Sequence, residues 1–336
     1  MSRANFFYLL AASVILVACI YSLLNWLAPR SDQLFGDYSA RLNRVLNINI
    51  TAPQTTRSLT PFSWRDYQQP EPVLQLSLLD SVGLKQCGLD QVIFDGNSSL
   101  GKHAAADYQL VWHTKIIQGL AECIQGKQLE PKLEDTLTVI LNKKIQSLSL
   151  YWGNYLVNEQ SLRYLWQSDH ALRQQPYSAY QSLANNLSYL NKLHQQLIEN
   201  HNLDHEGLLT LSESFAKGPS IFALLQEMKR SSLWLNEVST ALEKREFNCK
   251  NDRENDRKNG IVLKNILHKV YMEKLQRYLA ELDQSVRLLL PPLTALYHSQ
   301  KSSFLLMTTK KIHLDFQESN RQHVKQWQLI LDSCKA

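Results

Sequence analysis

The sequence predicts an all-α protein, an irregular multi-helix bundle with an extended proline-rich segment near its N-terminus. Apolar residues recur every three or four positions over long stretches, which is the pattern of a helix with one buried face. Alternating apolar runs bounded by hairpin turns, which would indicate a sheet, do not form a comparable set. Four prolines lie close together, at positions 53, 61, 70 and 72, and proline disfavours the interior of a helix.

Residues 1–28 form a signal or membrane-anchor segment. An almost unbroken apolar run from Phe6 to Ala28 follows Arg3, and residues 16–19, Leu-Val-Ala-Cys, have the pattern that lipoprotein signal peptidase reads. We therefore expect Cys19 to be lipidated. The alternative is a single N-terminal transmembrane helix, because the apolar run continues past Cys19 and about 20 apolar residues suffice to cross a bilayer. Both readings place the body on the periplasmic side of the cell envelope, attached to a membrane.

The rest of the chain, residues 32–336, is long enough for a single helical periplasmic domain. The full chain has 336 residues and a net charge of +5; removal of the segment before Cys19 takes away Arg3 and leaves 36 − 1 − 31 = +4. This small excess is spread along the chain without a Lys/Arg run. We therefore expect no nucleic-acid partner.

The first helix is expected from Asp32 to Asn47, with Asp32 as its N-terminal cap. Residues 49–75 carry the four prolines together with Phe62, Trp64 and Tyr67. This composition favours an extended segment that lies across the surface of the body over a flexible linker.

Helical periodicity then continues almost to the C-terminus. Val92 to Phe94 is a short apolar run that could be a strand, but it is too short to decide. Pro131 and Gly218-Pro219 are expected near helix starts, and Pro291-Pro292 are expected to stop the penultimate helix. The apolar positions that define the stripes are Trp112, Ile116, Leu120 and Cys123; Leu133, Leu137, Ile140, Leu141, Ile145 and Leu148; Leu183, Leu187, Leu190, Leu193 and Leu197; Ile221, Leu224, Leu225, Met228, Leu235, Val238 and Leu242; Ile261, Leu263, Ile266, Leu267, Val270, Tyr278, Leu282 and Val286; and Val324, Trp327, Leu331 and Cys334.

One stretch, residues 87–102, resembles a known family. Together with residues 37–46 upstream and His323, Trp327 and Cys334 downstream, it resembles the proteobacterial family called domain of unknown function 3080. The most specific piece is the run Asn97, Ser98, Ser99, Leu100 and Gly101. Members of this family look like envelope lipoproteins, so the resemblance supports lipidation of Cys19. It implies no activity, substrate or catalytic residue.

The same stretch matches the start of a phosphate-binding loop, because Gly96 to Lys102 fit the pattern G-x-x-x-x-G-K. The next position should supply a hydroxyl to magnesium, but it is His103, and magnesium prefers oxygen ligands. We therefore expect no nucleotide site. Asn97, Ser98 or Ser99 is expected to cap a following helix instead.

Other chemical patterns are weak. His201 and His205 are four residues apart, but Asn and Gly neighbours favour a solvated loop over a metal site, and His313 with Asp315 is a weaker pair. Ser98 or Ser99 with His103 or His113 lacks the Gly-x-Ser-x-Gly turn of a hydrolase. We expect no catalytic constellation, metal or cofactor.

If Cys19 carries lipid, Cys87, Cys123, Cys249 and Cys334 remain, an even number in an oxidising compartment. Four thiols allow three pairings. We predict Cys87–Cys123 and Cys249–Cys334, because each joins elements separated by few helices.

Two functions fit these observations. The first is a membrane-anchored, non-catalytic envelope lipoprotein that binds another envelope component or has a structural role. The alternative is an envelope hydrolase whose site is assembled from residues distant in sequence. An exposed apolar groove would favour the first, and a closed pocket where carboxylates or a Ser/His pair converge would favour the second.

Overall fold

The computed structural model describes residues 29–54, 63–72, 84–126, 129–167, 175–244, 254–298 and 303–333. These parts are helical apart from their connections and the segments 47–54 and 68–72, and no strand occurs in them. The all-α prediction is confirmed. Within the same ranges, no helix is both long and apolar enough to span a bilayer.

The helices have these bounds: α2 (Arg30–Leu46), the 3₁₀ turn η1 (Trp64–Tyr67), α4 (Asp90–Asn97), α5 (Ser99–Lys102), α6 (Ala106–Gly126), α7 (Pro131–Gln146), α8 (Leu148–Asn158), α9 (Gln160–Leu165), α10 (Tyr177–Asn200), α11 (His205–Ala216), α12 (Ile221–Glu243), α13 (Glu254–Ile266), the π-helical turns η2 (Leu267–Leu275), α14 (Gln276–Tyr297) and α15 (Ser303–Ser333).

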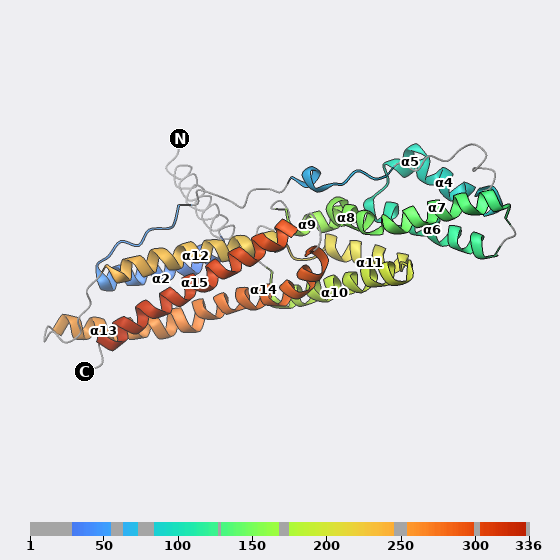
Figure 1. The fold of residues 1–336 in the computed structure, drawn as a ribbon. Helices are drawn as coiled ribbons and strands as arrows, with labels where there is room; N and C mark the ends of the chain where they lie inside the picture. The colour runs from blue at the N-terminus through green and yellow to red at the C-terminus, as the bar shows by residue number, and fades with distance from the viewer. Residues whose placement is uncertain are drawn as a thin grey trace, which may run out of the picture.

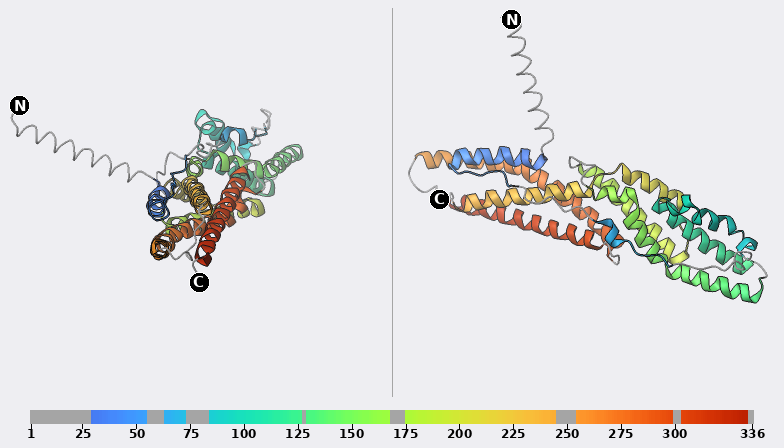
Figure 2. Two further views of the ribbon diagram at one scale, coloured as in Figure 1. Left: turned by 90° about the vertical axis from the view of Figure 1, so that its left-hand side faces the viewer. Right: turned by 90° about the horizontal axis from the view of Figure 1, so that it is seen from above.

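The molecule is elongated (Figures 1 and 2). At one end, α2, α12, α13, α14 and α15 lie side by side as a bundle, with α15 packed along α12. At the other end lie α4 to α8 and α11, and α10 joins the two halves by packing along α14. We call these the bundle end and the distal end.

One large apolar core runs through both halves of the molecule. Its largest side chains include Trp152, Trp166, Tyr180 and Phe215, all fully buried. A second, smaller apolar cluster lies in the distal end, where Leu84, Leu89, Ile116, Leu120 and Leu137 meet. Three members of this cluster, Leu84, Ile116 and Leu120, line the candidate site described below.

The first helix begins two residues earlier than expected, and Asp32 does not cap it. Its N-cap is Pro29, and Asp32 lies within the first turn. The Asp32 carboxylate instead accepts hydrogen bonds from Nε of Arg230 at 2.7 Å and from Nε1 of Trp234 at 2.6 Å. The prediction of a cap was wrong because a long-range ion pair with α12 takes the carboxylate away from the helix terminus.

The described parts of the proline-rich segment lie against the helical body, as expected. Tyr67 stacks on Phe304 with ring centroids 4.0 Å apart. The backbone of Gln69 exchanges two hydrogen bonds with the side-chain amide of Asn154, at 2.8 and 2.9 Å. These contacts bring Glu71 and Pro72, a few residues further along the chain, to the distal end.

Pro291 and Pro292 do not stop the penultimate helix, because α14 continues through both prolines and ends at Tyr297. A proline inside a helix costs about 3 kcal/mol. Here Leu289, Leu293 and Leu296 are buried in the core on either side of the two prolines. Tertiary packing of this apolar face therefore outweighs the local preference to end the helix.

Candidate functional site

The distal end contains a pocket of about 480 Å³ between α4, α5, α6, α7 and the end of the proline-rich segment. Its volume falls in the range of small-ligand sites. The wall is apolar over much of its area, with polar groups at a few places. The lining residues are Gln68, Glu71, Pro72, Leu84, Ile93, Gly96, Asn97, Gly101, Lys102, Tyr108, Gln109, Trp112, His113, Ile116, Leu120, Ile140 and Lys144.

The run 97–101 that carries the family resemblance forms the corner between α4 and α5 at the pocket. Ser98 caps α5, because its hydroxyl accepts a hydrogen bond from the Gly101 backbone N–H at 3.0 Å. The same hydroxyl donates to the carbonyl of Asp95 at 2.6 Å. The expected cap is therefore confirmed. Ser98 is the residue that provides it.

Two glycines allow this corner to pack closely. A Cβ atom on Gly101 would lie 2.2 Å from the Asp95 carbonyl oxygen, and one on Gly96 would lie 2.0 Å from the indole of Trp112. Trp112 is fixed in turn by a hydrogen bond of 2.6 Å from Nε1 to the Val92 carbonyl. The corner thus rests on an aromatic ring that also lines the pocket.

The segment 96–102 does not have the geometry of a phosphate-binding loop. That loop connects a strand to a helix, whereas here Gly96 lies in the last turn of α4 and Lys102 ends α5. Val92 to Phe94, the possible strand, lie inside α4. Lys102 nevertheless lines the pocket.

A polar chain of three residues reaches the pocket: the exposed Glu71, and the buried His113 on α6 and Lys144 on α7. Nε2 of His113 lies 3.1 Å from a carboxylate oxygen of Glu71, and Nζ of Lys144 lies 2.9 Å from Nδ1 of His113. Lys144 retains only 7% exposure. A buried ammonium normally has partners, and here the imidazole is one of them.

Aromatic rings enclose the polar chain. His113 stacks on Tyr151, with ring centroids 3.6 Å apart and planes within 9°. The Lys144 ammonium lies 5.1 Å from the ring centroid of Trp112 and 5.0 Å from that of Tyr151. A cation over an aromatic face is attracted by the ring quadrupole, which offsets part of the cost of burying the charge.

This environment shifts the pKa of each member of the polar chain. Burial lowers the pKa of Lys144 to about 8. Burial also lowers the pKa of His113, against the opposing effect of its hydrogen bond with Glu71. The hydrogen bond from His113 lowers the pKa of Glu71. At neutral pH the chain therefore holds a carboxylate, a neutral imidazole and an ammonium.

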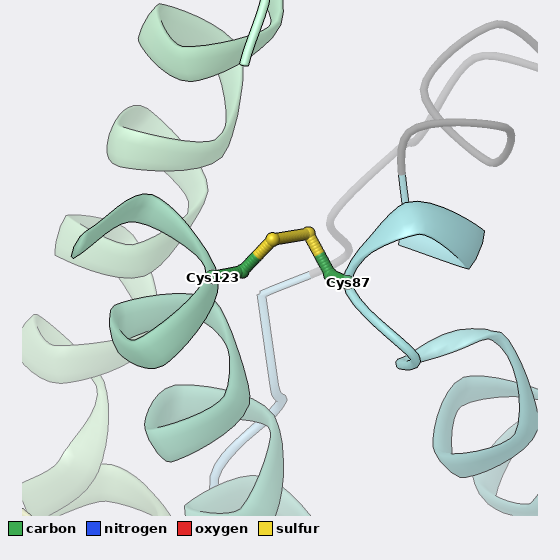
Figure 3. The surroundings of a disulfide bond; sticks show 2 residues. All are labelled: Cys87 and Cys123. Carbon is green, nitrogen blue, oxygen red and sulfur yellow. A yellow bond between two sulfur atoms is a disulfide. The ribbon is translucent and has the colours of Figure 1, made fainter. Parts of the chain in front are cut away.

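A disulfide joins Cys87 and Cys123 beside the pocket (Figure 3), with Sγ atoms 1.95 Å and Cα atoms 5.3 Å apart. Leu84 and Leu120, each three residues before one of the two cysteines, line the pocket. The disulfide therefore joins the two segments that supply these apolar lining residues. The remaining members of the predicted set, Cys249 and Cys334, lie outside the described residues, as does Cys19.

The other histidines of interest are placed apart from the pocket. His201 ends α10 in a left-handed conformation with φ 52°, and His205 begins α11 after the cap Asp204. His313 pairs with Asp283 at 2.7 Å and not with Asp315. Among the described residues, no group of three or more His, Cys, Asp or Glu side chains has a geometry suited to a metal ion.

A Ser/His pair does occur, but it lies in the core of the bundle end. His323 accepts or donates hydrogen bonds at 3.0 Å with both Tyr38 and Ser239, and Trp327 Nε1 donates to the Tyr38 hydroxyl at 2.6 Å. His323 has no exposed surface, so no substrate reaches it. This network joins residues from both ends of the chain, which sequence spacing alone does not reveal.

The comparison with protein-family models matches residues 35–336 to the model described as protein of unknown function (DUF3080). The chain belongs to the DUF3080 family. Searches of curated proteins and of solved structures found no match. The resemblance seen in the sequence is therefore confirmed over nearly the whole DUF3080 chain.

In this DUF3080 chain, two groups of the described residues that carried the resemblance have a clear structural place. Tyr38, His323 and Trp327 form the buried network that ties α2 to α15. The run 97–101 forms the corner above the pocket. Sequence reasoning missed the polar chain at the pocket, because Glu71, His113 and Lys144 come from three separate elements without a shared motif.

Proposed function

We propose that this protein is a membrane-anchored lipoprotein of the periplasmic side of the envelope that binds a small ligand in the distal pocket without transforming it. The observation that carries this proposal is a pocket with an aliphatic part of its wall and one buried lysine, Lys144, among its polar groups. Ligand sites in proteins are mostly apolar, with a few fixed polar groups that orient the ligand.

The hydrogen bonding of His113 supports binding over catalysis. A general base needs a ring nitrogen within reach of the substrate. Both nitrogens of His113 are engaged, Nδ1 with Lys144 and Nε2 with Glu71. The imidazole therefore acts as a spacer that holds the ammonium in position.

The anchor is proposed from the sequence. Residues 16–19 match a lipobox, and Cys19 would carry the acyl chains. Stable attachment needs two or more chains. Intact-mass analysis of protein extracted from membranes tests this part: a lipidated N-terminus beginning at Cys19 is expected, and an unmodified N-terminus that keeps Met1 or Ser2 establishes a transmembrane span instead.

A second candidate is an envelope hydrolase. The pairing of the Glu71 carboxylate with His113 at the edge of the pocket favours it, since a carboxylate that orients an imidazole is a common catalytic arrangement. In that case His113 would have to release Lys144 when substrate binds.

One experiment separates the two. The full chain is incubated with an envelope lipid extract and passed over a sizing column, and the compounds that stay bound are identified by mass spectrometry. A binding protein returns its ligand unchanged, whereas a hydrolase returns products. Ile140→Trp fills the pocket and should abolish retention, and Val139→Trp, at an exposed neighbouring position outside the pocket lining, should retain the ligand.

A further inference from the structure

We propose that the ligand of the distal pocket is an anionic amphiphile, with its carboxylate or phosphate group at Lys144 and its apolar chain along the wall beside the disulfide. This inference rests on the proposed binding function and specifies its ligand class. The geometry of the pocket supplies three separate reasons for it.

The first reason is charge. Among the described residues, the ionised side chains that line the pocket are Glu71, Lys102 and Lys144, which sum to 2 − 1 = +1 with His113 neutral. Lys102 and Tyr108 are exposed at the edge of the pocket. The net positive charge raises the local concentration of an anionic ligand over that of a neutral one.

The second reason is the hydrogen-bonding capacity of Lys144. An ammonium carries three N–H donors, and His113 Nδ1 accepts one of them. The faces of Trp112 and Tyr151 hold the cation in place without offering oxygen acceptors. Donors therefore remain for the oxygen atoms of an anionic group in the pocket, and a hydrogen bond between two ions is stronger than one between neutral groups.

The third reason is the wall next to Lys144. Five aliphatic side chains line the pocket there: Leu84, Ile93, Ile116, Leu120 and Ile140. Leu84, Ile116 and Leu120 belong to the small distal apolar cluster and are buried. A hydrocarbon chain against this wall gains about 25 cal/mol for each Å² removed from water. A small polar anion would leave the wall unused.

Calorimetric titration of the full chain tests the ligand class with four probes. Dodecanoate and dodecyl phosphate carry both a charge and a chain, dodecanol carries only the chain, and inorganic phosphate carries only the charge. We expect both anionic amphiphiles to bind at least about tenfold more tightly than dodecanol, since a hydrogen bond to a charged group contributes enough for that factor. Whichever of these two probes binds more tightly shows whether the natural ligand carries a carboxylate or a phosphate group. Inorganic phosphate should not bind measurably.

Variants assign the two ends of the ligand. Lys144→Met should weaken dodecanoate binding about tenfold or more, whereas Lys144→Arg, which keeps the positive charge but changes the shape of the donor group, should weaken it less. Lys143→Met is the matched control, because Lys143 is exposed, lies outside the pocket lining and should leave binding unchanged. Ile140→Ser should weaken the amphiphiles, and Val139→Ser should not. Melting curves of every variant verify that it is folded.

Equal affinity for dodecanol and dodecanoate, or unchanged dodecanoate binding in folded Lys144→Met, overturns the anionic ligand class. In that case the lipid extract decides whether the binding function stands. If the wild-type protein still retains a compound from the extract and Ile140→Trp does not, the pocket binds a ligand of another class. If neither the extract nor any probe binds, both proposals fail.

Discussion

Nζ of Lys144 lies 2.9 Å from Nδ1 of His113, inside the distal end of the molecule. An ammonium can only donate, so Nδ1 must be the accepting nitrogen and Nε2 carries the ring proton. That proton points to the Glu71 carboxylate, 3.1 Å away. The hydrogen bond from Lys144 therefore fixes the tautomer of the imidazole. The Lys144 cation, the neutral His113 ring and the Glu71 anion are then connected by hydrogen bonds in that order.

The first prediction concerns alkaline pH. The pKa of Lys144 is about 8 in the folded chain and 10.5 as its ordinary value, so between these values the unfolded state binds more protons. The free energy of unfolding should therefore rise with pH over this window relative to Lys144→Met, by up to about 3 kcal/mol. The other titratable groups that face the ammonium are Glu71, His113 and Tyr151. They are present in both the wild type and Lys144→Met, so their own titration largely cancels in the comparison. Urea titrations at pH 7, 8, 9 and 10 measure the difference in the free energy of unfolding between the wild type and Lys144→Met. This difference should not change with pH below pH 8.

The second prediction concerns acidic pH. Burial lowers the pKa of His323 to about 3, from an ordinary 6.5. Stability that depends on the neutral ring is complete above pH 6.5 and is lost as pH falls toward 3, because the unfolded state takes up the proton first. The groups around the ring are Tyr38, Ser239 and Tyr271.

His323→Gln removes the titrating ring. The free energy of unfolding of this variant should therefore fall by a few kcal/mol less than that of the wild type between pH 6.5 and 4. His103→Gln, at an exposed position, serves as the control. Identical pH profiles for wild type and His323→Gln would show that the ring is not held neutral in the core.

The third prediction compares two aspartates of α2. Asp32 receives hydrogen bonds from Arg230 and Trp234, whereas Asp37 forms an exposed pair with Arg41 at 2.9 Å. Asp32→Asn leaves the half-buried Arg230 without its counterion and should cost about 2 kcal/mol. Asp37→Asn should cost less than about 1 kcal/mol. Chemical denaturation measures both, and equal losses would contradict the importance assigned to the Asp32 contacts.

The fourth prediction concerns the disulfide. Cys87 and Cys123 are 36 residues apart, and closing a loop of that length contributes about 4 kcal/mol by the chain-entropy estimate. Replacing both cysteines with serine should lower stability by about this amount. Hydrogen exchange should increase first in residues 84–89, which lead into α4, and in α6, because the bond joins these two segments. Uniform exchange across the chain would indicate that the bond does not act locally.

Helical periodicity was enough to predict the fold class and most buried faces. The stripe Leu183, Leu187, Leu190, Leu193 and Leu197 is buried along α10 as expected. Local rules failed where a distant element competes: packing on either side of Pro291 and Pro292 carries α14 onward, and Arg230 removes Asp32 from its capping role. The site was out of reach because Glu71, His113 and Lys144 are isolated in sequence and meet only through tertiary packing.

The most direct test of the central claim is the pKa of Lys144 with and without ligand. The full chain is labelled with ¹³Cε,¹⁵Nζ-lysine, the Lys144 signal is assigned with Lys144→Arg, and its chemical shift is followed through a pH titration. We predict a pKa near 8 for the free protein and a pKa raised by at least about one unit with dodecanoate bound, because a neighbouring anion favours the charged ammonium. Dodecanol should leave the pKa at its free value or lower it. A pKa that does not respond to saturating dodecanoate would contradict an anion-binding role for this lysine.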